Sequence, residues 1–390
     1  MNLYKHIRIL EFALSSLFRR KFKNLVTVLM YSLIVFLTAS LLFLTHALTQ
    51  EAVELLQGSP GLIVQRIKGG RHELVPLRYA GEIEKIRGVS EVIPRFWGYY
   101  YDPPTGANYT FMGADELPPE IAMMIEGAFY NTNDRGGCII GQGVADVRFL
   151  ELEDIIPVKK SDGELYILRV RGIFKAESNL LTNDLIVMSI SDINTIFGIP
   201  AHTATDLVVR VRNPREVSTV ARKILDKLPD TRPIEKAELI RTYKALFAWR
   251  SGLMAAILLG SVTAFFIMIW DKATGLSAEE RKEIGILKAI GWEISDVLYL
   301  KFWEGVVIST VSFLAGIIAA HVHVFWFGSV LFLPILKGWS VLFPRLNFTP
   351  RIDFFQIFVI MFLTVIPYII ATIVPSWKAA VTDPDTITRT

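Results

Sequence analysis

Residues 279–291 read Glu-Glu-Arg-Lys-Glu-Ile-Gly-Ile-Leu-Lys-Ala-Ile-Gly, a charged start that runs directly into an apolar stretch. Ser277 and Glu280 have the Ser-x-x-Glu spacing of a capping box, which predicts a helix that begins here with carboxylates in its first turn. Apolar residues then recur every three or four positions and predict a single apolar stripe: Ile284, Leu287, Ile290, Ile294 and Val297. Gly285 and Gly291 weaken a helix, so close backbone contact or a bend explains them better than helix formation.

No partner for this stripe is evident elsewhere in the chain. The favoured interpretation is therefore a docking surface for another protein. The alternative is an amphipathic helix that lies on the lipid headgroups.

The helix stands between long apolar segments of a chain that is 52% hydrophobic, 20% charged and has a mean hydropathy of +0.41. These values predict a membrane part and a sizeable water-exposed part. The predicted fold class is four transmembrane α-helices plus a large α+β extracytoplasmic domain between the first and second. The predicted segments are a cytoplasmic amphipathic helix at 1–24, spans at 25–49, 248–270, 302–332 and 354–374, the outer domain at 50–247, the cytoplasmic helix region at 271–301, an outer loop at 333–353 and a cytoplasmic tail at 375–390.

Basic residues close to the spans predict the orientation. They cluster before the first span and between the second and third, which places both chain ends in the cytoplasm and the large domain in the periplasm or outside the cell. The cluster Arg19–Lys23 is interpreted as a topology and lipid-anchoring signal. A net charge of +3 without a long basic run argues against a nucleic-acid partner.

The outer domain is expected to combine strands and helices. Alternating apolar residues predict strands over 165–174 and 206–212, and Asn213-Pro214 precedes a predicted helix with Val217, Val220, Ile224 and Leu228 on one face. Cys138 is the sole cysteine, so no internal disulfide can form.

This domain contains a dense aromatic patch, with Pro103-Pro104 inside it, formed by Trp97, Tyr99, Tyr100, Tyr101, Tyr109 and Phe111. Aromatic residues dominate cores and strands, which favours domain core or a hairpin, and the functional alternative is a contact face for a partner or an apolar cargo. The connection over 328–353 is also apolar, with Trp339, Phe343 and Phe348, and could dip into the interfacial layer on the outer side of the membrane.

Several kinds of chemistry are not supported. The sequence has no phosphate-binding G-x-x-x-x-G-K-[ST] loop, and Gly141-Gln142-Gly143 is better explained as a strand-to-helix turn than as a dinucleotide loop. His321 and His323 point to different sides of a helix, which makes pore-facing or interface histidines more plausible than metal ligands. The apolar centres of the spans carry no Asp, Glu, Lys or Arg, so a proton-driven carrier is not favoured. We expect no catalytic residue, no metal site and no cofactor in this chain.

Residues 280–291, with Glu304 at the start of the next span, resemble the cytoplasmic segment of the FtsX-like permeases, the ABC-transporter subunits that include the MacB and LolC/LolE types. Further similarity is found before the first span, in the outer domain and near the chain end, at Leu17–Lys21, Gly141–Ala145, Val170–Phe174, Pro375–Ala380 and Asp383-Pro384.

The resemblance implies a permease that works as a dimer with a second identical or homologous copy and couples to a separate cytoplasmic ABC ATPase dimer, which binds ATP and Mg²⁺. It also implies contacts with membrane lipids and a periplasmic accessory or acceptor protein, and location in the cytoplasmic (inner) membrane. The residues expected to couple to the ATPase are Glu280, Arg281, Glu283, Ile284, Gly285, Leu287, Lys288 and Gly291.

The predicted function is conversion of ATP hydrolysis into movement of the outer domain, in order to extract or export an amphipathic cargo such as a lipoprotein, lipid, peptide or drug. The alternative is a transmembrane signal or force transmitter that activates a periplasmic enzyme or sensor without transport. A passive receptor without an ATPase would leave the helix that begins at Ser277 unexplained.

Overall fold

The computed structural model describes residues 3–57, 60–117, 123–130, 135–175, 182–247, 252–338, 341–342 and 348–381. Outside the described residues lie Trp339, Phe343 and Asp383-Pro384, together with residues 248–251 of the predicted second span and 382–390 of the predicted cytoplasmic tail. The chain forms two compact units, which we describe separately. One contains Met1–Thr49, Ala245–Val330 and Phe348–Thr390, and the other contains Gln50–Lys244 and Leu331–Asn347.

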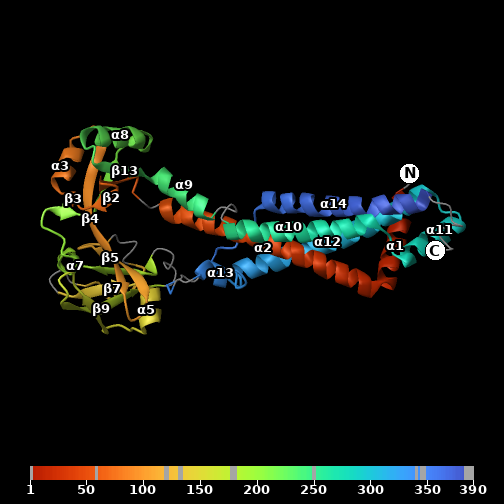
Figure 1. The fold of residues 1–390 in the computed structure, drawn as a ribbon, viewed down its shortest axis with the longest axis horizontal. Coiled ribbons are helices and arrows are strands. Elements are labelled where there is room, and N and C mark those ends of the chain that lie inside the picture. The colour runs from red at the N-terminus through yellow and green to blue at the C-terminus, as the bar shows by residue number, and fades with distance from the viewer. Residues whose placement is uncertain are drawn as a thin grey trace. The chain divides into compact units, whose positions relative to one another are not determined.

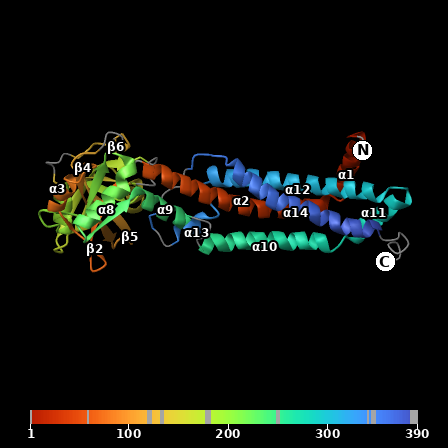
Figure 2. The ribbon, with the colours of Figure 1, turned by 90° about the horizontal axis from the view of Figure 1, so that it is seen from above.

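The first unit is helical (Figure 1). Its helices are α1 (Leu3–Arg19), α2 (Lys21–Gln57), α10 (Gly252–Thr274), α11 (Ala278–Ala289), α12 (Ile294–Phe325) and α14 (Phe354–Val381). Among the described residues, four helical stretches are long and apolar enough to cross a membrane, judged by length and composition: Lys21–Glu51, Ala255–Thr274, Ile294–Phe325 and Phe354–Val381. Helix α12 packs against α1 and α14, and α14 also contacts α10 (Figure 2).

Small residues allow close approach between these helices. Gly316 of α12 lies against α2, where an added Cβ would stand 2.7 Å from the Cβ of Val35 and 2.8 Å from the carbonyl oxygen of Ser32. Such contacts are typical of helix packing in lipid, where dispersion replaces the hydrophobic effect as the main attraction. The fully buried Tyr31 ring lies near Phe265 and Tyr368, with ring centroids 5.4 and 5.1 Å away.

Helix α12 differs from the predicted span over 302–332. It begins at Ile294, eight residues earlier, and ends at Phe325, because Gly328 and Ser329 turn the chain with φ of 57° and 58°. His323 is an interface residue, as predicted, with its Nδ1 3.2 Å from Oγ of Ser40.

The second unit mixes strands and helices, as predicted. Its strands are β1 (Leu62–Lys68), β2 (Arg71–Glu73), β3 (Val75–Pro76), β4 (Val89–Asp102), β5 (Ala107–Gly113), β6 (Ile125–Gly127), β7 (Gly137–Ile140), β8 (Ile155–Lys159), β9 (Leu165–Phe174), β10 (Leu185–Met188), β11 (Thr203–Ala204), β12 (Asp206–Val211) and β13 (Thr231–Glu235). Its helices are α3 (Arg78–Glu84), α5 (Gln142–Arg148), α7 (Ile190–Phe197), η2 (Pro214–Glu216), α8 (Val217–Lys227), α9 (Lys236–Phe247) and α13 (Leu333–Lys337).

The long strand β4 joins two lobes of this unit. Within the described residues an 11-stranded sheet has the order β13-β1-β12-β4-β5-β10-β7-β9-β6, with β2 on β1 and β8 on β9. Residues 89–95 of β4 pair with β12, and residues 96–102 pair with β5. Each lobe has its own apolar core, one around Leu62 and Val209 and the other around Phe111 and Ile140.

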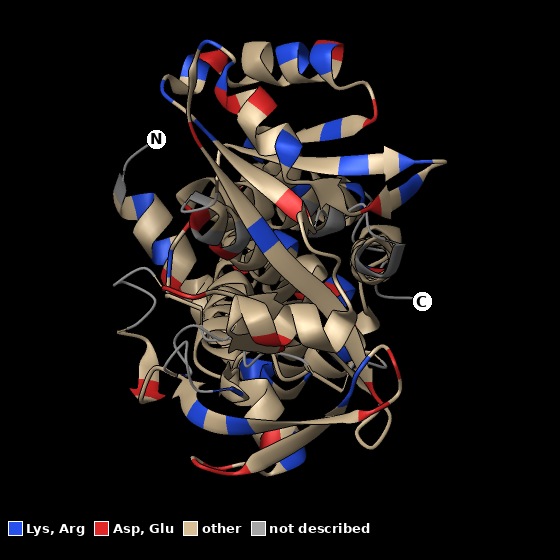
Figure 3. Ribbon diagram, turned by 90° about the vertical axis from the view of Figure 1, so that its left-hand side faces the viewer, with Lys and Arg blue, Asp and Glu red and all other residues tan. Residues whose placement is uncertain are grey.

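The local sequence predictions for this unit agree with the structure. The predicted strands are β9 and β12, the predicted helix is α8 with Val220 and Ile224 buried, and Gly141 is the turn between β7 and α5. Lys and Arg are interspersed with Asp and Glu over the described helices and strands of this unit (Figure 3).

Candidate functional site

The helix predicted from Ser277 forms as expected and is fixed at its start by two reciprocal hydrogen bonds. The backbone N–H of Glu280 donates to Oγ of Ser277 (3.4 Å), and the backbone N–H of Ser277 donates to Oε2 of Glu280 (3.1 Å). At the other end, Gly291 adopts φ of 99° and its N–H donates to the carbonyl oxygen of Lys288 (3.0 Å). Gly291 is therefore the bend that the sequence indicated, because a positive φ favours glycine.

The apolar stripe of α11 has partners in this chain, so the expectation that it lacks an internal partner is wrong. Ile284 is fully buried against Val297 and Ala380, and Leu287 packs with Ile9 and Ala13 of α1 and Leu300 of α12. Gly285 is buried between them.

The continuous stripe also divides in two. The bend at Gly291 ends α11, so Ile290 and Ile294 point away from Ile284 and Leu287 and remain 69% and 41% exposed. The sequence pattern assumed one unbroken helix, which the bend removes.

Acidic residues on successive turns of α11 bind the elbow between α1 and α2. Glu283 accepts hydrogen bonds from Nη2 of Arg19 (2.9 Å), from Oγ of Ser16 (3.1 Å) and from the Arg20 guanidinium. Glu280 forms ion pairs with Nη1 of Arg20 (3.1 Å) and with Nζ of Lys23 (3.5 Å). We call the set Arg19, Arg20, Lys23, Glu280 and Glu283 the elbow clamp.

Arg20 is the centre of the clamp because it contacts both carboxylates. Its side chain is 15% exposed, and those of Glu280 and Glu283 are 13% and 19% exposed. The sequence assigned Arg19–Lys23 to topology and lipid anchoring and missed this role.

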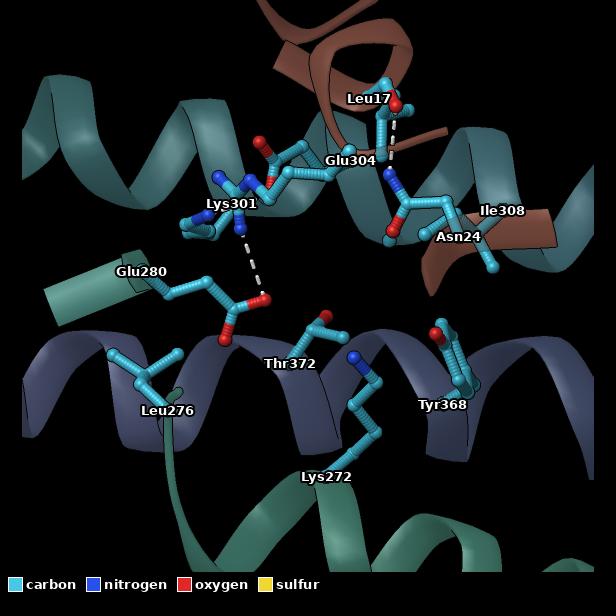
Figure 4. A pocket seen from close by; sticks show the side chains of 12 residues that line it. Leu17, Asn24, Lys272, Leu276, Glu280, Lys301, Glu304, Ile308, Tyr368 and Thr372 are labelled. Atoms are coloured by element: carbon cyan, nitrogen blue, oxygen red, sulfur yellow. Dashed lines mark hydrogen bonds and ion pairs between the residues drawn. The ribbon is translucent and has the colours of Figure 1, made fainter. Parts of the chain in front are cut away.

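A small polar cavity of about 30 Å³ lies behind the clamp (Figure 4). Lys272 of α10 and Glu280 of α11 point into it, and Lys301 and Glu304 of α12 line it beside Tyr368 of α14. Nζ of Lys301 donates to Oε2 of Glu304 at 2.6 Å, and both residues are buried. Glu304 is thus a paired charge. A cavity of this size has room for one or two water molecules.

The charges around the cavity keep Glu280 ionised. Burial by itself raises the pKa of its carboxyl, but Lys272, the backbone N–H of Ser277, Lys23 and Lys301 outweigh that effect and leave the pKa below its ordinary value. A carboxylate that stays charged can hold the elbow.

The outward side of α11 carries apolar side chains that the described residues leave uncovered. We call Lys282, Ile286, Ala289 and Ile290 the outer face of α11; all four are exposed, Ile286 by 55%. Of the residues predicted to couple, Arg281 and Gly291 are exposed, Lys288 is half-buried, and Glu280, Glu283, Ile284, Gly285 and Leu287 face the interior of the chain. Ile286 escaped the sequence analysis because it lies off the stripe.

The aromatic patch of the second unit lies on the β4–β5 hairpin and splits between two faces. Tyr100 packs on Phe111 with ring centroids 5.0 Å apart, within a lobe core. Tyr99 and Tyr101 point to the other face and are 71% and 59% exposed. Trp97 shares their face and donates from Nε1 to Oδ2 of Asp206 (2.9 Å).

Comparisons with known proteins cover both units. The family model described as "MacB-like periplasmic core domain" matches residues 25–227, and that described as "FtsX-like permease C-terminal" matches residues 251–384. A protein of Methanocaldococcus jannaschii described as an uncharacterized ABC transporter permease is 25% identical over 294 residues, which are 71% of this chain and 67% of that protein.

Two solved structures also match. The periplasmic region of MacB from Actinobacillus actinomycetemcomitans has 12% identity and a TM-score of 0.33, covering 50% of this chain and 97% of that chain. The extracellular domain of the noncanonic ABC-type transporter YknZ from Gram-positive bacteria has 13% identity and a TM-score of 0.31, covering 45% of this chain and 99% of that chain.

Proposed function

Because the chain belongs to the FtsX/MacB-type family of ABC transporter permeases, a membrane-embedded family with a periplasmic core domain and an ATPase partner, we propose that it transmits ATP-driven motion to its periplasmic domain. In this proposal a separate cytoplasmic ATPase hydrolyses ATP, and the permease, as a homodimer or heterodimer in the inner membrane, extracts or exports an amphipathic cargo. The cargo would be a lipoprotein, lipid, peptide or drug.

The outer face of α11 is the proposed docking site for the ATPase, and it carries the proposal. Ile286 and Ile290 stand one turn apart and expose apolar surface at the end of a helix in which Ile284 and Leu287 are buried and two acidic residues are ion-paired. Burial of an exposed Ile contributes about 1.5–3 kcal/mol, so these two side chains would supply about 3–6 kcal/mol toward docking of the helix in a groove of a partner.

The elbow clamp supports a route for the motion. A displacement of α11 would move Arg20 through Glu280 and Glu283, and Arg20 directly precedes α2. Helix α2 is a single helix of 37 residues, about 55 Å at 1.5 Å per residue, and the chain enters β1 at Leu62 shortly after it ends. The described spans lack the mid-membrane carboxylate of a proton-driven carrier, which is consistent with energy supplied from a partner.

Copurification of the full-length protein tests the proposal. Wild type is expected to bring down an ATPase, identified by mass spectrometry, and Ile286→Asp or Ile290→Asp should weaken that association about a hundredfold, because a charge replaces buried apolar surface. Ile7→Asp is the matched control, since Ile7 is 48% exposed on α1 and is not part of the outer face of α11. Retention of the ATPase by both α11 variants, or no ATPase with wild type, would refute the proposal.

A further inference from the structure

Strand β4 changes neighbours at Arg95, and beyond that point no strand of the described residues pairs with one of its two edges. The carbonyl oxygen of Arg95 accepts from the backbone N–H of Thr205 (2.9 Å). At Trp97 the Thr205 hydroxyl takes over: Oγ1 accepts from the backbone N–H of Trp97 (3.0 Å) and donates to its carbonyl oxygen (2.9 Å). Strand β12 begins only at Asp206, so its pairing does not continue along β4.

The next residues on this edge are Tyr99 and Tyr101. Tyr99 stands opposite Thr110 of β5, but the N–H of Thr110 donates to the carbonyl oxygen of Asp184 on the far side (2.9 Å). In an antiparallel ladder, a pair that does not exchange hydrogen bonds directs its N–H and C=O groups outward. The main-chain groups of Tyr99 and Tyr101 therefore face away from β5, and among the described residues no strand pairs with them.

A cavity of about 500 Å³ adjoins this edge, between β4 and the β1–β2 hairpin. Its lining includes Gln65, His72, Glu73, Trp97, Tyr99 and Thr205. The Trp97 ring is held by Asp206 and stacks on His72 with centroids 6.0 Å apart. The fixed Trp97 ring thus lies beside the outward main-chain groups of Tyr99 and Tyr101. This arrangement suits an added strand, because strand addition combines main-chain hydrogen bonds with pockets for alternate side chains.

The tip of the β1–β2 hairpin is positively charged. Lys68 and Arg71 are exposed, and neither forms an ion pair with a carboxylate of the described residues. Arg71 is next to His72, which stacks on Trp97, so the basic tip borders the cavity. A partner with acidic residues would complement it.

We propose that the β4 edge from Tyr99 to Tyr101 binds an extended segment of a partner polypeptide. The segment adds as a strand beside β4, places an apolar or aromatic side chain in the cavity and carries Asp or Glu opposite Lys68 and Arg71. A lipid chain fits less well, because Gln65, His72 and Glu73 line the cavity. A second copy of the chain is also disfavoured, since two residues of free edge offer far less area than a stable dimer needs.

The test uses full-length protein in lipid nanodiscs and a displayed library of random peptides about ten residues long, a length typical of a strand, with empty nanodiscs for counter-selection. We expect enriched peptides that alternate β-branched or aromatic residues with polar ones and carry Asp or Glu. Tyr99→Pro should weaken their binding about tenfold, because it removes an outward N–H that the β4–β5 ladder does not use. Tyr99→Ala keeps that N–H but removes a ring that lines the cavity, so it should weaken binding less than Tyr99→Pro does.

A second measurement leaves the protein unchanged. Methylation of the peptide amides along one edge should abolish binding, whereas methylation along the other edge should not, since only one edge of an added strand faces β4. The proposal is overturned if no peptide is enriched, if both methylated sets bind equally, or if Tyr99→Pro binds as wild type does. Copurification of the ATPase with Tyr99→Pro separates this result from the proposed function, because the variant leaves α11 unchanged.

Discussion

Removal of the negative charge of Glu283 should loosen α11 from the elbow by an amount that the contacts define. Glu283 accepts from three donors, but Arg19 is 58% exposed and contributes little. The contact with Arg20 dominates, with side chains 15% and 19% exposed. Hydrogen bonds between charged groups are worth about 1.5–3 kcal/mol, and Gln retains one acceptor, so Glu283→Gln should cost about 1.5 kcal/mol.

Amide hydrogen exchange over residues 278–290 of the full-length protein in nanodiscs measures this cost. A loss of about 1.5 kcal/mol in the free energy of opening should speed exchange about tenfold. Glu279→Gln is the matched control: it makes the same change in the same helix at an exposed position, and only the interaction of Glu279 with the helix dipole is lost, a change of a few fold at most.

Arg20→Met completes a double-mutant cycle. Because Arg20 also binds Glu280, this variant alone should cost more than Glu283→Gln, about 3 kcal/mol. The double variant should fall short of the sum by about 1.5 kcal/mol, the interaction between the two side chains. Strictly additive effects, or exchange in Glu283→Gln as slow as in wild type, would show that the clamp does not hold α11.

Two further changes test the packing and the electrostatics of the two units. Gly316→Val should destabilise the helical unit by about 1–3 kcal/mol and lower its thermal midpoint, because its Cβ would meet Val35. Gly260→Val is the control: no heavy atom lies within 4 Å of the added Cβ, so the midpoint should change much less. Equal shifts in the two variants would contradict this packing. Burial raises the pKa of Asp102, but Arg148, with hydrogen bonds from Thr105 and Tyr109, outweighs it and holds the pKa below its ordinary value, so the unfolded chain takes up the proton more readily. The stabilisation should therefore be complete above about pH 4 and be lost as the pH falls through the folded pKa. Asp102→Asn should flatten the acid limb of a pH-dependent melting series.

The features that local sequence determines were predictable. A capping box involves residues three apart, and the alternation of strand 165–174 involves neighbours two apart, so Ser277 and β9 could be located without knowledge of the fold. The split of the aromatic patch into core and exposed faces follows the same period of two, and it assigns Tyr100 to the core.

The position at which α11 packs in the fold could not be predicted in this way. Arg20 and Glu283 are 263 residues apart, and no local pattern indicates that the elbow and the helix meet. The apolar stripe of α11 indicated that Ile284 and Leu287 have a partner, but it could not indicate whether that partner lay in this chain or in another. Ile284 and Leu287 proved to be buried by α1, α12 and α14, so the uncovered surface is a different one, around Ile286.

Strand β4 is shared by both lobes, and its two ladders meet at Arg95 and Phe96 without overlapping. A tilt of one lobe against the other would therefore break no ladder hydrogen bond. One contact that resists such a tilt is the carboxylate of Asp206, which accepts from Arg95 on one side of the junction (2.6 and 2.7 Å) and from Trp97 on the other (2.9 Å). This buried acid and the neighbouring Thr205, whose hydroxyl bonds both main-chain groups of Trp97, thus bridge the junction, so we expect them to stiffen it together.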